Sequence, residues 1–581
     1  MKTQRFCFQT VTLALAAGLV YSVGQPSLSA QTKDVAPVHS AYVESTRGVV
    51  ASDHPLASEL GAQTLARGGN AADAGVTAML ALGVLNPFAS GLGGGGFCLY
   101  RPIETGETTV LDFREVAPQA AHRDVYIIDG QAQPALARRG GWAVGVPGEA
   151  GGLWSLHGRF GALPWEQVVE PAHRIAQDGF DVGKMLTEHL TNMSEELAGH
   201  AELTARFRAA DGSWLQPGDR AFAPALARTL RILMEQGSAP FYSGEVAGAI
   251  VEAVNKAGGQ FVDQDMLNYR VVPREPIVGT YRGLEIIGMP PPSSGAIALL
   301  EVLNILEGDD LAKLGWSAPA VHLITEALKH AFADRAHLIG DPDFVEVPTE
   351  RLISAEHAAM LRARILDDAV LPFDQYGTSR PNDEIGGTSH LSIIDAQGNM
   401  LACTTTVNGR FGAMVYVPEY GIVLNNEMAD FNVEPGTPNM WGLVGSEQNT
   451  VQPGKRPLSS MSPTLVLKDG QPYMSLGASG GPTIITGTLF ALLHLVDFGR
   501  TPSEAVTFTR LHHQWLPNQL FVEFDNEPWI EALRAKGHDV VPRRAFNSVQ
   551  LVVRNAEGLF VGVSDHRKYG EPKAPVEQSS K

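Results

Sequence analysis

The run GGTSHLSIID, residues 386–395, sets the interpretation of this chain, because two glycines bring a threonine to the head of a predicted strand. Residues 390–394 and 400–407 alternate as paired strands do, around an Ala-Gln-Gly-Asn turn. The preceding segment, LPFDQYGTSRPNDEIGG at residues 371–387, is polar and contains glycine and proline. It is predicted to be an exposed loop, where chain cleavage is easiest to accommodate. A threonine after two glycines is usually just the start of a strand. Whether this threonine has a functional role must therefore be judged from the rest of the chain.

Apolar periodicity predicts a mostly helical part up to about residue 370 and a strand-rich part from residue 388. Strand pairs that alternate with buried helices indicate an α+β fold in which helices cover sheets. The predicted helices are residues 56–68, 71–85, 222–237, 243–258, 294–306, 318–338 and 483–497. The other predicted strand pairs are 97–101 with 108–113, 464–468 with 473–477, and 549–554 with 559–563.

Composition and charge exclude several classes of partner. The chain has 581 residues, of which 44% are hydrophobic and 18% charged, as in an ordinary globular protein. Acidic residues outnumber Lys plus Arg by 63 to 44, and the formal net charge is −19. Phosphates would repel such a surface, so neither a nucleic acid nor an anionic membrane is an expected partner.

The first thirty residues are typical of a secretory signal peptide. Lys2 and Arg5 precede an apolar run at residues 10–23, and small residues at 27–30 offer cleavage points. The apolar run is short for a membrane span, although an uncleaved N-terminal anchor is the alternative. We therefore expect a periplasmic or secreted protein with no membrane span in its mature form.

Two cysteines, Cys98 and Cys403, remain after removal of residues 1–30. One bridge between them is possible, but both lie in strand-like apolar runs, where small buried thiols are the commoner outcome. The sequence has no CxxC or HExxH pattern, and the adjacent His512 and His513 would point to opposite faces of an extended segment. No metal site and no cofactor are predicted.

The glycine run GLGGGG, residues 91–96, formally matches the dinucleotide-binding pattern GxGxxG. That pattern binds phosphate only where a strand precedes it and a helix follows it. Here the predicted helix 71–85 precedes the run and the predicted strand 97–101 follows it. We reject the nucleotide interpretation and predict a tight turn that allows close backbone packing.

Several motifs together resemble those of the γ-glutamyltransferases, which are N-terminal-nucleophile hydrolases, over roughly residues 40–565. After residue 388 they are TTTVN (404–408), NNEMADF (425–431), KRPLSSMSP (455–463) and GASGG (477–481). Before it they are SGLGGGGF (90–97), LDFRE (111–115) and GMPPPSSG (288–295).

The resemblance implies a four-layer αββα sandwich that cuts itself between Gly387 and Thr388. Behind a signal peptide at residues 1–30, it implies a helix-rich large subunit, 31–387, interlocked with a strand-rich small subunit, 388–581. It also implies small-molecule partners: γ-glutamyl compounds such as glutathione, with water, amino acids or peptides as acceptors.

Cleavage before Thr388 would supply one residue with both a nucleophile and a base. A neutral threonine hydroxyl is a poor nucleophile and needs an adjacent base. The new α-amine has a pKa of about 7.7–8.0, near the pH at which a general base works best. This accounts for the lack of a recognisable Ser-His pair. The same hydroxyl would attack the Gly387 carbonyl during processing.

By resemblance, Thr406 orients the Thr388 hydroxyl, and the backbone amides of Gly480 and Gly481 form the oxyanion hole. The loop at residues 435–443 resembles one that covers the glutamyl site in many bacterial members.

The resemblance also implies a charged substrate pocket. The α-carboxylate of a γ-glutamyl group would bind Arg114, assisted by Ser459 and Ser460. Its α-ammonium would bind Asp430, assisted by Glu427 and Asn408.

Two alternatives remain. A glutaryl-cephalosporin acylase of the same fold would handle a substrate without an α-ammonium, which leaves Asp430, Glu427 and Asn408 with no charge to meet. An uncleaved periplasmic binding protein would remain a single chain. The sequence leaves acceptor preference open.

Overall fold

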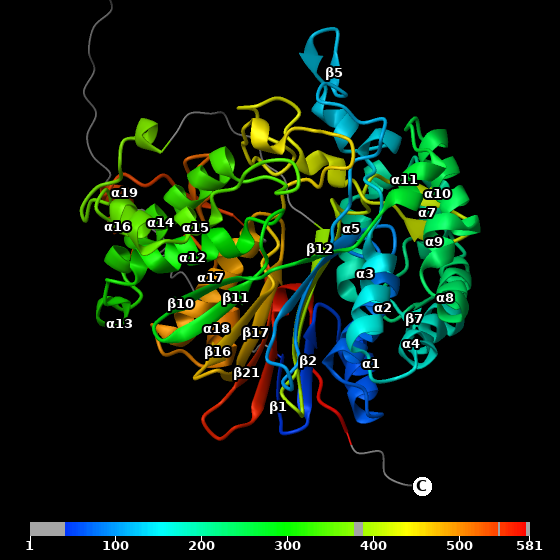
Figure 1. Cartoon of the computed structure of the whole chain (residues 1–581), viewed down its shortest axis with the longest axis horizontal. Helices are drawn as coiled ribbons and strands as arrows, with labels where there is room; N and C mark the ends of the chain where they lie inside the picture. Colours follow the sequence, from blue (N-terminus) through cyan, green and yellow to red (C-terminus); the bar gives the residue numbers. More distant parts are fainter. Residues whose placement is uncertain (1–40, 377–386, 544–546, 577–581) are drawn as a thin grey trace, which may run out of the picture. The chain divides into compact units, whose positions relative to one another are not determined.

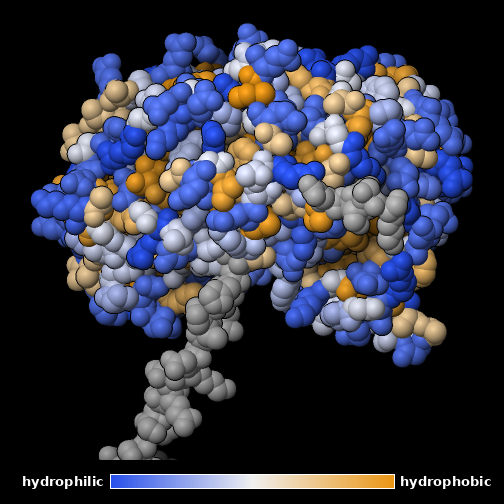
Figure 2. All heavy atoms as spheres, turned by 90° about the horizontal axis from the view of Figure 1, so that it is seen from below, coloured by the Kyte–Doolittle hydropathy of each residue, from blue (hydrophilic) through white to orange (hydrophobic). Residues whose placement is uncertain are grey.

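The computed structural model describes residues 41–376, 387–543 and 547–576. The predicted signal peptide and most of the predicted cleavage loop, residues 377–386, lie outside these ranges. Among the described residues, no helix has the length and apolarity needed to cross a bilayer. On the face drawn in Figure 2, hydrophilic residues predominate and hydrophobic ones lie in small scattered groups.

Two antiparallel sheets lie at the centre of the described part, and β12 and β13 of one pack against β17 of the other (Figure 1). The six-stranded sheet has the order β2 (Gly48–Ser52), β12 (Gly387–Asp395), β13 (Met400–Asn408), β3 (Gly95–Arg101), β4 (Thr109–Phe113) and β9 (Val272–Arg274). The seven-stranded sheet has the order β1 (Ala41–Ser45), β22 (Phe560–Ser564), β21 (Ser548–Arg554), β17 (Gln471–Ser479), β16 (Thr464–Lys468), β11 (Leu284–Gly288) and β10 (Ile277–Tyr281).

Helices cover the outer side of each sheet (Figure 1). Beside the six-stranded sheet lie α1 (Pro55–Ala66), α2 (Ala71–Leu85), α3 (Glu149–Phe160), α4 (Trp165–Asp178), α5 (Lys184–Asn192), α8 (Pro224–Gln236) and α10 (Glu245–Lys256). Beside the seven-stranded sheet lie α12 (Gly295–Leu306), α14 (Ala318–Leu338), α16 (Ala355–Arg362) and α17 (Thr483–Val496).

Shorter elements complete the described chain. The short helices are α6 (Ser194–Leu197), α7 (Ala201–Thr204), α9 (Ala239–Ser243), α11 (Asp263–Asn268), α13 (Leu311–Leu314), α15 (Thr349–Leu352), α18 (Pro502–Thr507) and α19 (Ile530–Ala535). The short strands pair as β5 (Ile127–Ile128) with β6 (Gln131–Ala132), β7 (Phe180–Asp181) with β8 (Arg220–Ala221), and β14 (Tyr416–Val417) with β15 (Ile422–Val423). A three-stranded sheet joins β18 (Leu511–His512), β19 (Leu520–Val522) and β20 (Val540–Pro542).

The predicted elements agree closely with the observed ones. The helices predicted at 71–85 and 318–338 have those bounds, and Asn70 caps the first of them in a capping box with Asp73. The strand predicted to begin at residue 390 begins at Gly387 instead, because Gly387 and Thr388 already pair with β13. Thr388 therefore lies within the ladder between β12 and β13, in the interior of the sheet.

The glycine run brings the start of β3 against neighbouring backbone. A Cβ added to Gly94 would lie 1.9 Å from the carbonyl oxygen of Thr406, and one on Gly96 would lie 2.2 Å from that of Thr404. Gly93 has the same relation to Val423, at 2.0 Å. These approaches confirm the prediction of close backbone packing, and they place β3 directly beside the strand that carries Thr406.

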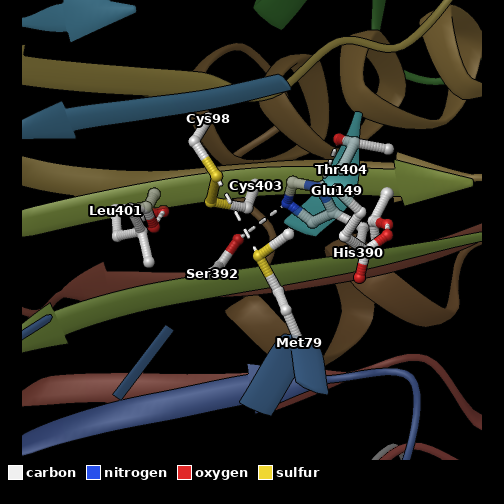
Figure 3. The surroundings of a disulfide bond; sticks show 10 residues. Met79, Cys98, Glu149, His390, Ser392, Leu401, Cys403 and Thr404 are labelled. Atoms are coloured by element: carbon white, nitrogen blue, oxygen red, sulfur yellow. Dashed lines mark hydrogen bonds between the residues drawn. A yellow bond between two sulfur atoms is a disulfide. The ribbon is translucent and has the colours of Figure 1, made fainter. Parts of the chain in front are cut away.

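A disulfide joins Cys98 of β3 to Cys403 of β13 (Figure 3). The two residues are direct partners in the ladder, with their Cα atoms 4.2 Å apart, and Met79 of α2 lies beside the bond. The expectation of two buried thiols was therefore wrong. Apolar alternation predicts that each segment is a strand, but not which strands are neighbours or in what register.

Replacement of Gly94 by alanine should destabilise the fold by about 3 kcal/mol, because the new methyl group would overlap the rigid Thr406 carbonyl. Urea denaturation of the two proteins measures the difference. The matched control is Gly248→Ala in α10, where an added Cβ meets nothing within 4 Å and helix propensity should raise stability by up to about 1 kcal/mol. Equal stabilities of the two variants would contradict the packing argument.

Candidate active site

Thr388 and Thr406 are opposite each other on β12 and β13, and both side chains are buried. Their hydroxyl oxygens lie 3.2 Å apart. The Thr406 hydroxyl donates to the carbonyl oxygen of Gly387 at 2.7 Å and accepts from the backbone N–H of Asn408 at 2.8 Å. With its proton used in this way, Thr406 is left to accept the proton of the Thr388 hydroxyl, which fixes the direction of that hydroxyl.

The bond between Gly387 and Thr388 lies at an irregularity in the ladder. Gly387 pairs with Asn408 and Thr388 with Thr406, so one residue of β13 is left over as a bulge. A Cβ on Gly387 would lie 2.7 Å from the carbonyl oxygen of Phe88, so this position has no room for a side chain. Asn408 itself has a φ of +68°, in the left-handed region.

A buried charged group lies beside this pair of threonines. Arg114, just after β4, forms ion pairs with Glu427 and Asp430 of the short 3₁₀ turn Glu427–Asp430. Its Nε donates to the carbonyl oxygen of Pro457 at 2.7 Å. Arg114 and Glu427 are each about 1% exposed, so this group is held away from water.

The carboxylates of this group are not fully satisfied by the protein. Among the described residues, Glu427 Oε2 and both carboxylate oxygens of Glu115 have no hydrogen-bond partner. Burial, opposed by Arg114 and reinforced by the neighbouring Asp430, raises the pKa of Glu427 to about 8. Burial also raises the pKa of Glu115 well above its usual value. The pocket therefore favours a ligand that brings positive charge.

The predicted site residues come together around one cavity. Ser459 and Ser460 approach it from the segment before β16: Ser459 Oγ accepts from Met461 N at 3.0 Å, and Ser460 Oγ lies 3.5 Å from Arg335 Nη2. The cavity is narrow, about 30 Å³. Its lining includes Arg114, Thr388, Thr406, Asn408, Glu427, Asp430, Ser459, Ser460 and Gly481.

Gly480 and Gly481 form the turn between β17 and α17, with φ of +139° and +62°, a region that favours glycine. Their peptides therefore lie at the N-terminal end of a 14-residue helix. Helix N-termini favour negative charge, as an oxyanion would carry. Gly480 is not itself part of the cavity lining, whereas Gly481 is.

The loop predicted to cover the glutamyl site, residues 435–443, contributes to the lining of this cavity. Trp441 and Leu443 are buried and line the cavity, and the Trp441 indole N–H donates to Asp430 Oδ1. Trp441 also lies against Gly481, where an added Cβ would be 3.3 Å from its ring. The loop thus contacts both the charged group and the glycine turn.

Lys568, which the sequence analysis did not single out, also reaches the site. Its Nζ donates to the carbonyl oxygen of Thr388, to Ser479 Oγ at 2.6 Å and to Asp53 Oδ2 at 3.2 Å. Asp53 is almost fully buried and also accepts from Gln550 and Ser479. No local pattern marks Lys568 or Asp53, because their roles arise from contacts between the two ends of the chain.

Arg335 of α14 is a second cation that the sequence analysis missed. It is buried, and its Nε donates to Ser294 Oγ at 3.0 Å. Burial lowers the pKa of Arg335 to about 10, while nearby Asp430 raises it.

Two groups with metal-ligand chemistry lie elsewhere in the described chain. His322, Glu326 and His538 form one, and Glu301, Asp334 and His357 form the other. In the first, the two histidines hydrogen-bond at 2.7 Å and Glu326 pairs with Lys329. None of these residues lines the cavity at Thr388.

Comparisons with known proteins agree with this arrangement. A family model described as Gamma-glutamyltranspeptidase matches residues 57–574. The glutathione hydrolase proenzyme of Escherichia coli (strain K12) is 41% identical over 531 residues, or 90% of this chain and 91% of that protein. The acylase ACY 1 proenzyme of Pseudomonas sp. (strain V22) is 37% identical over 541 residues, or 91% and 94%. The crystal structure of cephalosporin acylase from Bacillus halodurans matches with a TM-score of 0.82 and 27% identity, over 93% of this chain and 98% of that one.

The fold, a mixture of helices and sheets, is shared with enzymes of the N-terminal-nucleophile hydrolase class. Within that class, the chain is an enzyme of the gamma-glutamyltranspeptidase family, whose model spans most of its length.

Replacement of Lys568 by methionine should cost about 3 kcal/mol of stability, because it leaves the buried Asp53 carboxylate without its cation. Urea denaturation measures the loss. Lys573→Met is the matched control, because Lys573 pairs with Glu571 at the surface and should contribute less than about 1 kcal/mol. Equal losses in the two variants would show that Lys568 does not stabilise Asp53.

Proposed function

We propose that this enzyme is a γ-glutamyltransferase with glutathione hydrolase activity. It cleaves the γ-glutamyl amide of glutathione and related compounds, and it passes the γ-glutamyl group to water, amino acids or peptides. The observation that carries the proposal is the buried group of Arg114, Glu427 and Asp430 beside Thr388. A γ-glutamyl group has both an α-carboxylate and an α-ammonium, so it needs one cation and at least one anion in its pocket.

When the substrate binds, ion pairs within the protein are replaced by ion pairs with the substrate, and the net charge of the pocket does not change. Arg114, with Ser459 and Ser460, binds the α-carboxylate by a fork of parallel hydrogen bonds. Asp430 and Glu427 bind the α-ammonium, and the unpartnered Glu427 Oε2 supports this assignment. Asn408 completes the ammonium site. Because the cavity is narrow, the loop carrying Trp441 and Leu443 must move to admit the substrate.

Processing begins on the uncut chain. The Thr388 hydroxyl attacks the Gly387 carbonyl carbon, whose oxygen receives a hydrogen bond from Thr406. The peptide bond breaks as the acyl group moves from nitrogen to oxygen, and water then hydrolyses the resulting ester. The products are a large subunit ending at Gly387 and a small subunit beginning at Thr388, and the precursor also carries a signal peptide at residues 1–30.

Catalysis uses the amine that processing creates. The α-amine of Thr388 takes the hydroxyl proton as the oxygen attacks the γ-carbonyl of the substrate, and the amides of Gly480 and Gly481 stabilise the oxyanion. The proton passes to the departing amine, which leaves a γ-glutamyl ester on Thr388. Water or an acceptor amine then attacks the ester and restores the free hydroxyl.

The remaining parts of the proposal concern architecture and compartment. The two sheets and their outer helices are proposed to form the four-layer αββα sandwich of self-cleaving N-terminal-nucleophile hydrolases. Each sheet contains strands from both sides of the Gly387–Thr388 bond, which supports interlocked subunits. The Cys98–Cys403 disulfide supports export to the periplasm or the exterior, where disulfides persist.

The second candidate function is that of an acylase, since an acylase proenzyme is 37% identical to this chain. A glutaryl group has no α-ammonium, so Asp430 and Glu427 would remain buried without the charge that they are placed to bind. We expect kcat/KM for γ-glutamyl-4-nitroanilide to exceed that for glutaryl-4-nitroanilide by at least about 50-fold.

The variant Asp430→Asn should shrink this preference, whereas Asp124→Asn, at an exposed carboxylate, should leave it unchanged. Release of nitroaniline measures both substrates. A preference for the glutaryl anilide would identify the enzyme as an acylase instead.

Processing should be visible on a denaturing gel only after reduction, because the disulfide joins residues on opposite sides of the cut. With reductant, we expect bands of about 38 and 21 kDa, in proportion to the 62.2 kDa of the whole chain. Without reductant, one band near the size of the intact protein should remain.

The variant Thr388→Ala should run as a single inactive chain with and without reductant. For the unaltered protein, N-terminal sequencing of the smaller fragment should begin at Thr388. A single band from the unaltered protein after reduction would refute processing and favour an uncleaved binding protein.

A further inference from the structure

A second, much larger cavity lies on the other side of the wall that closes the catalytic pocket. Its volume is about 720 Å³, within the range of pockets that hold peptides and other small molecules. It is lined by Arg138, Arg139, Asn192, Met193, Glu196, Gly409, Arg410, Met440, Gln519, Phe521, Val541, Pro542 and Arg543.

The lining of this cavity is strongly cationic. It contains four arginines and one acidic residue, Glu196, in a chain whose formal net charge is −19. Glu196 already pairs with Arg139 at 2.8 Å. Arg410 is half-buried, and its Nε has no hydrogen-bond partner among the described residues. The described residues therefore leave this buried donor of Arg410 unsatisfied.

The cavity shares its wall with the catalytic pocket. Gly409 lines the cationic cavity, and the preceding residue, Asn408, lines the catalytic one. Likewise, Met440 lines the cationic cavity, and the next residue, Trp441, lines the catalytic one. Asn408 Nδ2 lies 3.6 Å from Met440 Sδ.

Gly409 also borders the cleavage bond. A Cβ on Gly387 would lie 3.3 Å from the carbonyl of Gly409. The cationic cavity thus begins beside the bond that joins Gly387 to Thr388.

We propose that this cavity binds carboxylates in the part of the substrate beyond the scissile amide, either in the leaving amine or in the acceptor. This rests on the proposed function, in which the catalytic pocket takes only the γ-glutamyl group. Whatever is attached to the γ-carbonyl must then lie outside that pocket, next to Thr388. The arginines that line the cavity, Arg410 among them, select acidic amino acids and peptides over neutral ones, because guanidinium groups bind carboxylates by charge-assisted hydrogen bonds.

Two matched pairs of substrates separate the two sources of the carboxylate. For the leaving group, kcat/KM is compared between γ-glutamyl-3-carboxy-4-nitroanilide and γ-glutamyl-4-nitroanilide, which differ by one carboxylate. For the acceptor, transfer rates from the neutral anilide are compared between glutamate and glutamine. Each comparison is a ratio within one protein, so differences in the amount of folded, processed enzyme cancel.

In the unaltered enzyme we expect a preference for the carboxylated member in at least one pair. Arg410→Gln, alone and with Arg543→Gln, should lower that ratio about tenfold, and Arg410→Lys should retain part of it. Arg534→Gln is the matched control, because Arg534 pairs with Glu531 at the surface.

Ratios that are unchanged by the Arg410 and Arg543 substitutions in both pairs would overturn the proposal. So would a decrease of the same size in Arg534→Gln. Failure of the proposed function gives a different result, since the unaltered enzyme would then release no nitroaniline from either γ-glutamyl anilide.

Discussion

The pairing of β12 with β13 is the constraint on which the rest of the site depends. These neighbouring strands lie within the six-stranded sheet, and their ladder brings Thr388 opposite Thr406. The bulge between the Gly387 and Thr388 pairings leaves the Gly387 carbonyl within reach of the Thr406 hydroxyl. The position of Thr406 also depends on Gly94 of the neighbouring segment, because any side chain at Gly94 would displace the Thr406 peptide. A buried ladder with one irregular step thus holds two hydroxyls and one carbonyl in a fixed relation.

The charged groups around this ladder differ in how far they are buried and in how fully they are paired. The innermost group, Arg114 with Glu427 and Asp430, is almost fully buried, so its ions pair with one another. Lys568 and Asp53 form a separate pair, and Lys568 donates to the carbonyl oxygen of Thr388. The arginines of the larger cavity are only half-buried, and Glu196 is the one acidic residue among the described residues that line it. In the catalytic pocket, buried ions of both signs favour a ligand that carries a positive and a negative charge. In the larger cavity, the excess of arginine favours an anion.

Much of the site could be predicted because family motifs are local in sequence. The residues of LDFRE, NNEMADF and KRPLSS were each expected from a short run, and the structure brings Arg114, Glu427, Asp430, Ser459 and Ser460 to one cavity. Lys568, Asp53 and Arg335 were missed because nothing near them in the sequence is unusual. Asp53 and Lys568 are more than 500 residues apart, and only the fold makes them partners.

By itself, the sequence determined the helices and strands, the turn glycines and the family motifs, because periodicity and turn chemistry act over a few neighbouring residues. Only the tertiary structure decided the Cys98–Cys403 disulfide, the contact of Trp441 with Asp430, and the cationic cavity beside Gly409. Each of these depends on which strands or loops are neighbours, and Cys98 and Cys403 are 305 residues apart. Such pairings follow from the packing of the whole core, which no short stretch of sequence specifies.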